Sequence, residues 1–257
     1  MAQSGFDRRR INGPEDSFPP VFDSDSPQWN LGDPRKDRYA ADIRPIFLQP
    51  GLISQANGSA YIETAKTKIA CAVYGPRQSK NMTYSEMGRL NVEVKFTPFS
   101  CVRRRAPMRD AEDRSIAVAI HQALVSSVRL ELLPKSTIDI FITIIESDGL
   151  EGCVASGSIA ASTALADAGI ELLGLVTSCA ACAVGKEIWL DPTEEEGRCS
   201  NGTLVLACMS ALGKVTSVWQ TGEMKIADAL GCIDACQEKC TEIHSVVAQA
   251  LLDNVKP

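Results

Sequence analysis

The sequence has little that would mark a protein that coats nucleic acid. Its 257 residues carry 26 Lys and Arg against 32 Asp and Glu, which gives a formal net charge of −6 and no overall basic surface for a polyanion. Aromatic residues make up only 5% of the chain, so few side chains are available for stacking bases. Any contact with nucleic acid must therefore come from a local group of basic residues.

Long apolar segments are also missing. No stretch of about 18 uninterrupted apolar residues occurs, and residues 1–11 lack the apolar core of a secretion signal. We therefore expect no membrane association and a reducing compartment. In that setting the ten cysteines are expected to be free thiols packed in the core, not a disulfide framework.

Motifs for common catalytic chemistry are scarce. The chain has no GxxxxGK[ST] loop for nucleotide hydrolysis, and its two histidines, His121 and His244, lack an obvious Ser or Cys partner. The CxxC pair Cys179 and Cys182 has no second pair at metal-ligand spacing, so a zinc or redox module stays an alternative reading. The acidic run 194–196 could hold Mg²⁺ but is more typical of a solvated loop. We expect no metal and no cofactor.

The composition changes sharply near residue 42. Residues 1–42 hold five of the thirteen prolines and few aliphatic residues, which predicts an extended or disordered tail that is draped at most on a partner or on its own domain. Residues 43–257 predict a folded domain in two lobes, about 43–150 and 151–257.

Hydrophobic periodicity predicts the elements of these lobes. Both lobes read as a β-sheet with helix packed on it, so the fold class is α+β. The pattern predicts a hairpin over 58–65 and 68–74, further strands over 90–96, 137–145, 172–178, 183–190, 202–209 and 215–219, and helices over 114–130, 156–168 and 225–252.

One segment of the folded part is locally basic. Between Cys101 and Arg114 five arginines stand against three acidic residues, a local charge of +2 on an acidic chain. Arginine forks match phosphate oxygens without selecting a base sequence, so this loop is a candidate contact for an RNA backbone. A solvated loop or a contact with another subunit is the alternative. The candidate RNA-binding residues are Arg103, Arg104, Arg105, Arg109 and Arg114.

Four collinear segments resemble the RNase PH family. They are residues 43–77, which include RPIFLQPGLISQANGSAYIETA, residues 96–101 (FTPFSC), residues 134–142 (PKSTIDIFI) and residues 164–170 (ALADAGI). The resemblance covers roughly residues 43–253. It implies an RNase PH-like fold of two repeated β-α-β lobes (ribosomal protein S5 domain 2-like), six subunits in a ring and, in active members, phosphate-dependent shortening of RNA from the 3′ end.

The residues that active members use for this chemistry are missing. The phosphate-binding Thr-Arg pair falls on Cys153 and Val154, and the two active-site aspartates fall near Gly197 and Thr203. Of a pair of arginines at the start of the first long helix, only Arg114 remains, after Asp113. We therefore expect no catalytic residue in this chain.

Silent members of this kind resemble ring subunits of the eukaryotic RNA exosome, and residues 44–60 and 103–107 resemble one type among them. The resemblance implies paralogous ring subunits and S1/KH-type cap subunits as partners, and a location in the nucleus, including the nucleolus, and the cytoplasm. The expected function is a non-catalytic scaffold that guides RNA through the channel of the ring. The alternative is an active phosphate-dependent 3′-to-5′ exoribonuclease.

Overall fold

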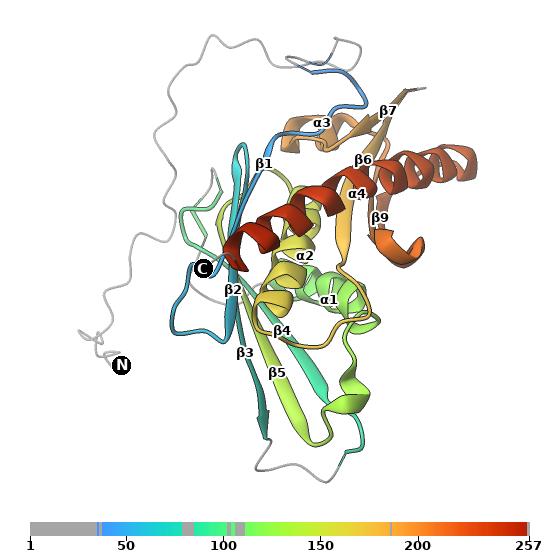
Figure 1. The fold of residues 1–257 in the computed structure, drawn as a ribbon. Helices are drawn as coiled ribbons and strands as arrows, with labels where there is room; N and C mark the ends of the chain where they lie inside the picture. Colours follow the sequence, from blue (N-terminus) through green and yellow to red (C-terminus); the bar gives the residue numbers. More distant parts are fainter. Residues whose placement is uncertain are drawn as a thin grey trace, which may run out of the picture.

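The computed structural model describes residues 35, 38–78, 85–101, 104–105, 111–185 and 187–255, which form two sheets and four α-helices (Figure 1). The first sheet has the strand order β1-β2-β3-β5-β4 and the second the order β7-β6-β8-β9. The strands of the first sheet are β1 (Ile46–Pro50), β2 (Gly58–Thr64), β3 (Thr67–Gln78), β4 (Arg89–Phe96) and β5 (Ser136–Glu146). Those of the second are β6 (Thr177–Val184), β7 (Glu187–Leu190), β8 (Gly202–Met209) and β9 (Lys214–Gly222). The helices are α1 (Ala111–Val125), α2 (Leu150–Asp167), α3 (Glu194–Cys199) and α4 (Ile226–Val255), with short 3₁₀ turns at Leu130–Leu132 and Ser210–Leu212.

Strand β5 is the centre of the first sheet, as its β-branched, nearly continuous apolar sequence predicts. It pairs antiparallel with β3 and parallel with β4, so both of its edges are hydrogen-bonded. Helix α1 connects β4 to β5 as a crossover, which is why these two neighbours run in the same direction. The alternation over residues 90–96 is confirmed: Leu90, Val94 and Phe96 are buried, whereas Arg89 and Lys95 point away from the helices and are exposed.

Helix α2 occupies the middle of the molecule, with the first sheet on one side and the second sheet on the other (Figure 1). Every residue from 152 to 165 is buried. A helix enclosed on all sides has no polar face, and its Ala, Ser and Gly residues let both sheets approach closely. The α+β class that the sequence predicts is confirmed, with the core formed where α2 meets the two sheets.

Several element boundaries differ from the sequence prediction, and the helix expected over 114–130 spans Ala111–Val125. The strand expected over 172–178 is wrong, because β6 begins only at Thr177, and the strand expected over 183–190 is the end of β6, a turn at Gly185 (φ 64°) and β7. The helix expected from residue 156 begins at Leu150. Residues 176–183 are buried on both faces, so their sequence lacks the alternation that would mark where a strand starts.

A carboxylate at the end of α2 joins this helix to β2 and α4. Asp167, at the end of α2, accepts hydrogen bonds from the Ser59 backbone N–H at 2.9 Å and from Asn254 Nδ2 at 3.1 Å. The motif residues 58–60 and 164–167 therefore meet in space. Gly58 lies so close to α2 that a Cβ there would stand 2.3 Å from the carbonyl oxygen of Ala164. No helix of the described residues is long and apolar enough to cross a bilayer.

Gly58→Ala should lower the free energy of unfolding by about 2–3 kcal/mol, because β2 or α2 must move to make room for the methyl group. Gly174→Ala is the matched control, since a Cβ at Gly174 meets its nearest atom at an ordinary 3.7 Å. Urea unfolding monitored by circular dichroism measures both variants. Equal stability of the two would contradict the close packing of β2 on α2.

Candidate functional site

The N-terminus of α2 is the first candidate site, because the free backbone N–H groups of a long helix attract anions. In this chain acidic side chains already stand there. Glu151, in the first turn, accepts a hydrogen bond from Thr203 Oγ1 at 2.8 Å, and Thr203 Oγ1 lies 2.5 Å from Thr221 Oγ1. Asp148, just before the helix, accepts from the backbone N–H of Glu194 at 3.3 Å. The site is therefore anionic and hydroxyl-lined.

The structure brings together some of the positions that the family resemblance assigns to catalysis. A Cβ at Gly197 would lie 3.9 Å from both Glu151 Oε2 and Thr203 Cγ2, so the two positions expected for aspartates do meet at the start of α2. The positions expected for the Thr-Arg pair, Cys153 and Val154, follow Glu151 on α2, and both side chains are buried, at 0% and 3% exposed. Neither side chain can donate a hydrogen bond of useful strength to phosphate.

Three arginines hold the loops around this site. Arg44 binds Asp191 through Nε (2.7 Å) and Nη2 (2.5 Å), and its Nη1 donates to Asp148 at 2.5 Å. Arg35 binds Glu196 through two nitrogens, each at 2.9 Å. Arg38 adds contacts to Asp191 at 3.3 Å and to Glu196 at 3.2 Å. We call these six side chains, Arg35, Arg38, Arg44, Asp148, Asp191 and Glu196, the arginine clamp.

The clamp lowers the pKa values of Asp191 and Glu196. Burial alone would raise the pKa of Asp191, but the hydrogen bonds and charge of Arg44 outweigh it and hold the pKa below its ordinary value. Burial likewise opposes a low pKa for Glu196, and Arg35 together with the Thr193 backbone N–H lowers the pKa below its ordinary value. Glu196 also closes a capping box with Thr193 at the start of α3.

The acidic run 194–196 is therefore not a solvated loop. It forms α3, in which Glu196 belongs to the arginine clamp and Glu194 pairs with Arg198. Among the described residues no group of three or more His, Cys, Asp and Glu side chains could hold a metal ion. Cys179 and Cys182 both lie within β6 and are buried, and all ten cysteines are free thiols.

The second candidate site is the arginine-rich loop. Arg103 and Arg109 lie outside the described residues, and Arg104 is exposed. Arg105 is held within the protein: its guanidinium lies 4.0 Å from the centre of the Phe96 ring, Nη2 donates to Glu112 at 2.6 Å, and Nε donates to Cys101 Sγ at 3.2 Å. The structure thus gives Arg104 and Arg105, which are neighbours in sequence, different surroundings.

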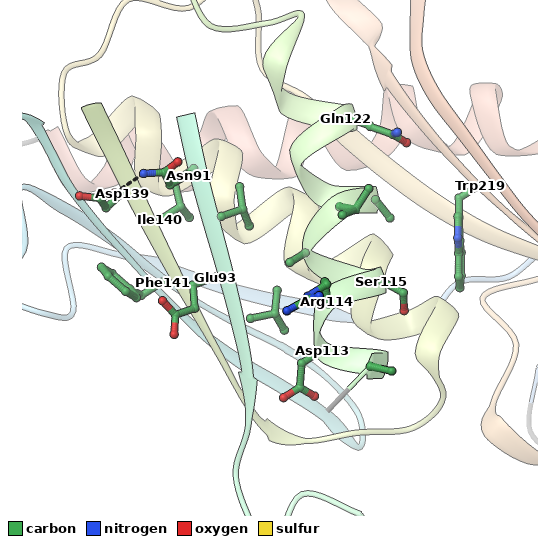
Figure 2. A pocket seen from close by; sticks show the side chains of 16 residues that line it. Asn91, Glu93, Asp113, Arg114, Ser115, Gln122, Asp139, Ile140, Phe141 and Trp219 are labelled. Atoms are coloured by element: carbon green, nitrogen blue, oxygen red, sulfur yellow. Dashed lines mark hydrogen bonds between the residues drawn. The ribbon is translucent and has the colours of Figure 1, made fainter. Parts of the chain in front are cut away.

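Arg114 projects into a groove beside α1. Figure 2 shows Glu93 and Phe141 on one side of β4, Arg114 and Ser115 on α1, and Trp219 beyond the helix. Arg114 is the one cation that lines this groove in the described part of the chain, whereas Glu93, Asp113 and Asp139 supply three carboxylates. Asp139 accepts a hydrogen bond from Asn91 Nδ2 at 2.9 Å. The groove as a whole is therefore not basic.

Family profiles match most of the chain. Residues 42–171 match domain 1 of the 3′ exoribonuclease family, RNase PH, and residues 174–238 match domain 2 of the same family. The chain belongs to the RNase PH family. The RNase PH-like fold that the sequence motifs imply is confirmed, and the boundary between the two matches falls between α2 and β6.

Relatives within the RNase PH family extend over nearly the whole chain. The chain is 35% identical to the exosome complex component mtr3 of Schizosaccharomyces pombe, covering 96% of both chains. It is 35% identical to the exosome complex component MTR3 of Homo sapiens, covering 96% of this chain and 94% of the human one. A solved structure of rice Rrp46 has a TM-score of 0.76 at 20% identity, covering 84% of this chain and 98% of that one, which supports the fold.

Sequence reasoning missed the arginine clamp. Arg44 belongs to the motif that carries the resemblance to the RNase PH family, but the motif alone does not show its partners 104 and 147 residues away. Arg35 and Arg38 fall in the segment predicted as a tail, and nothing in their surroundings sets them apart from solvated charges. Paired charges from distant segments leave no periodic signal in a sequence.

Arg44→Met should lower the free energy of unfolding by about 3–5 kcal/mol, because it leaves Asp148 and Asp191 buried without their main counter-charge. Arg129→Met is the control: Arg129 pairs with Glu131 and Glu171 but its side chain is 38% exposed, so the loss should stay below about 1 kcal/mol. Urea titration at pH 7 measures both. A loss of similar size in the two variants would rule out the clamp as a major source of stability.

The same clamp predicts how stability depends on pH. Asp191 and Glu196 have lower pKa values in the folded chain than unfolded, so the unfolded chain takes up more protons as the pH falls. Their contribution is complete above about pH 5 and declines as the pH falls through about 4 and below. Thermal unfolding between pH 3 and 7 should show this decline, and it should be shallower in Arg44→Met. An unchanged slope in that variant would contradict the assignment.

Proposed function

We propose that the chain is a non-catalytic ring subunit of an RNA exosome, where it pairs with paralogous RNase PH-like subunits and guides RNA toward a separate nuclease. The observation that carries this proposal is the near end-to-end match to two exosome components of the Mtr3 type. Cap subunits of the S1/KH type and a location in the nucleus, nucleolus and cytoplasm form part of the same proposal.

Loss of catalysis is supported by the chemistry at the start of α2. Phosphorolysis needs a cation beside the inorganic phosphate, but the position expected for that arginine is the buried Val154. The carboxylate of Glu151 stands in the first turn of the helix and accepts its hydrogen bond from Thr203, so it repels an incoming phosphate. Arg44, the nearest arginine of the clamp, is already bound to two carboxylates.

RNA guidance is assigned to the exposed part of the arginine loop. Arg104 is exposed and makes no ion pair with another described residue. We assign the same role to Arg103 and Arg109. The guanidinium of Arg105 packs on Phe96 and binds Glu112, so it is not available to bind phosphate. Arg114 lines a groove that also holds the carboxylates of Glu93, Asp113 and Asp139, so its contribution should be smaller.

The competing function, phosphorolysis, makes a direct prediction. The purified chain, incubated with oligoadenylate labelled on every internal phosphate, Mg²⁺ and unlabelled inorganic phosphate, should release no labelled nucleoside diphosphate above a protein-free blank. Thin-layer chromatography of the products measures this. Release that requires phosphate, scales with the amount of chain and disappears in Thr203→Val would contradict the proposal, because Thr203 stands where an active-site aspartate is expected.

Arg103→Ala, Arg104→Ala and Arg109→Ala together should weaken RNA binding by the assembled ring and reduce its salt dependence. Each lost phosphate contact lowers the slope of log affinity against log salt by about one. The control replaces three exposed cations elsewhere, Lys66, Lys214 and Lys225, by alanine and changes the net charge by the same amount. Filter binding of oligouridylate between 50 and 200 mM salt compares them. Equal slopes in the two triple variants would refute the assignment.

A further inference from the structure

Strand β4 presents a free edge. It is the last strand of the first sheet and pairs only with β5 among the strands of the described residues. Every second residue of such an edge points its N–H and C=O groups away from its neighbour, where they are available to another extended chain. The edge is eight residues long, which is enough to form a regular ladder.

Helix α1 runs alongside this edge and provides an apolar wall. Val118, on the exposed side of α1, is 50% exposed, and the partly exposed Val92 of β4 lines the same groove, whose volume is about 990 Å³. Figure 2 shows the helix and the strand on the two sides of this space. Aliphatic side chains of an added strand would be buried between the two elements.

The opposite face of β4 carries unpaired positive charge. Arg89 and Lys95 both point to the outer face of the sheet and are exposed, and the side chains of both make no hydrogen bond or ion pair within the described part of the chain. They are six residues apart on one face, which corresponds to roughly 20 Å along the strand. An adjacent strand can place side chains directly beside each of them.

We propose that the free edge of β4 binds an extended segment of another protein chain, which adds as a strand with acidic side chains beside Arg89 and Lys95 and aliphatic side chains against Val92 and Val118. The alternation of the two faces sets the chemistry of this segment: aliphatic residues at every second position face the groove, and the positions between them are acidic beside Arg89 and Lys95 but uncharged beside Glu93, which lies on the same face between the two cations. The site goes beyond the proposed ring function and does not depend on whether the chain is catalytic.

The charges favour a protein segment over RNA here. The groove contains the carboxylates of Glu93, Asp113 and Asp139. An RNA strand would place a phosphate every few ångströms along the edge, so these carboxylates would repel it. With Arg89, Lys95 and Arg114 the local formal charge is zero. A strand with carboxylates only at the two positions beside Arg89 and Lys95 can meet these cations and keep uncharged side chains beside Glu93.

Two synthetic nine-residue peptides test the proposal by fluorescence polarisation with the full chain: a Glu peptide, Val-Glu-Val-Thr-Val-Thr-Val-Glu-Val, whose two glutamates are spaced like Arg89 and Lys95, and a Lys peptide with lysine in place of each glutamate. The wild type should bind the Glu peptide roughly threefold or more tightly than the Lys peptide. Each opposite-charge cross-strand pair strengthens binding by a factor smaller than ten, and the Glu peptide forms two such pairs. Arg89→Glu with Lys95→Glu should reverse the preference. The control, Lys66→Glu with Lys214→Glu, changes two exposed cations away from β4 and should keep it.

Two further measurements separate strand addition from simple charge attraction. A Glu peptide N-methylated at alternate residues along one edge should lose binding, because it lacks the N–H groups that face β4. Val118→Asp should weaken the Glu peptide, whereas Val246→Asp, at a valine of α4 that is 42% exposed, should not. Equal binding of the methylated peptide, or an unchanged preference in the double variant, overturns the proposal. So does oligouridylate that displaces the peptide and loses affinity in the same variant, which would make the edge an RNA site.

Discussion

The pairing of Arg35, Arg38 and Arg44 with Asp148, Asp191 and Glu196 is the interaction on which the candidate site depends. The arginines come from the segment before β1, and the carboxylates come from the loop before α2, the residue after β7 and helix α3. These segments are irregular or short, so sheet hydrogen bonds do not fix them. Charge-assisted hydrogen bonds in a buried setting do, because separating either partner would leave a charge without compensation.

The clamp explains how the chain's own side chains hold the start of α2. In an anion site the positive end of a helix is balanced by the ligand. Here Asp148 and Glu151 balance it from within the chain, and Arg44 and Thr203 satisfy those two carboxylates. The pocket-forming loops are thus ordered by internal charge pairs.

The sequence predicts those parts of the structure that repeat along one element. The strand β4 and the long helix α4 have clear periodicity, the central strand β5 has a β-branched and nearly continuous apolar sequence, and the positions of all three agree with the prediction. Strand β6 was placed wrongly because it is buried on both faces, and α3 was missed because a six-residue helix shows only its capping box, Thr193 and Glu196. The different surroundings of Arg104 and Arg105 depend on Phe96 and Glu112, which only the folded chain brings to the loop.

Native mass spectrometry of the tagged chain, purified from its own cells in gentle buffer, tests the central claim most directly. The account predicts a complex that contains six different RNase PH-like chains, this one among them, and that loses the chain as a single subunit when activated in the gas phase. A monomer, or an assembly built only from copies of this chain, would contradict the role of a subunit in a mixed ring.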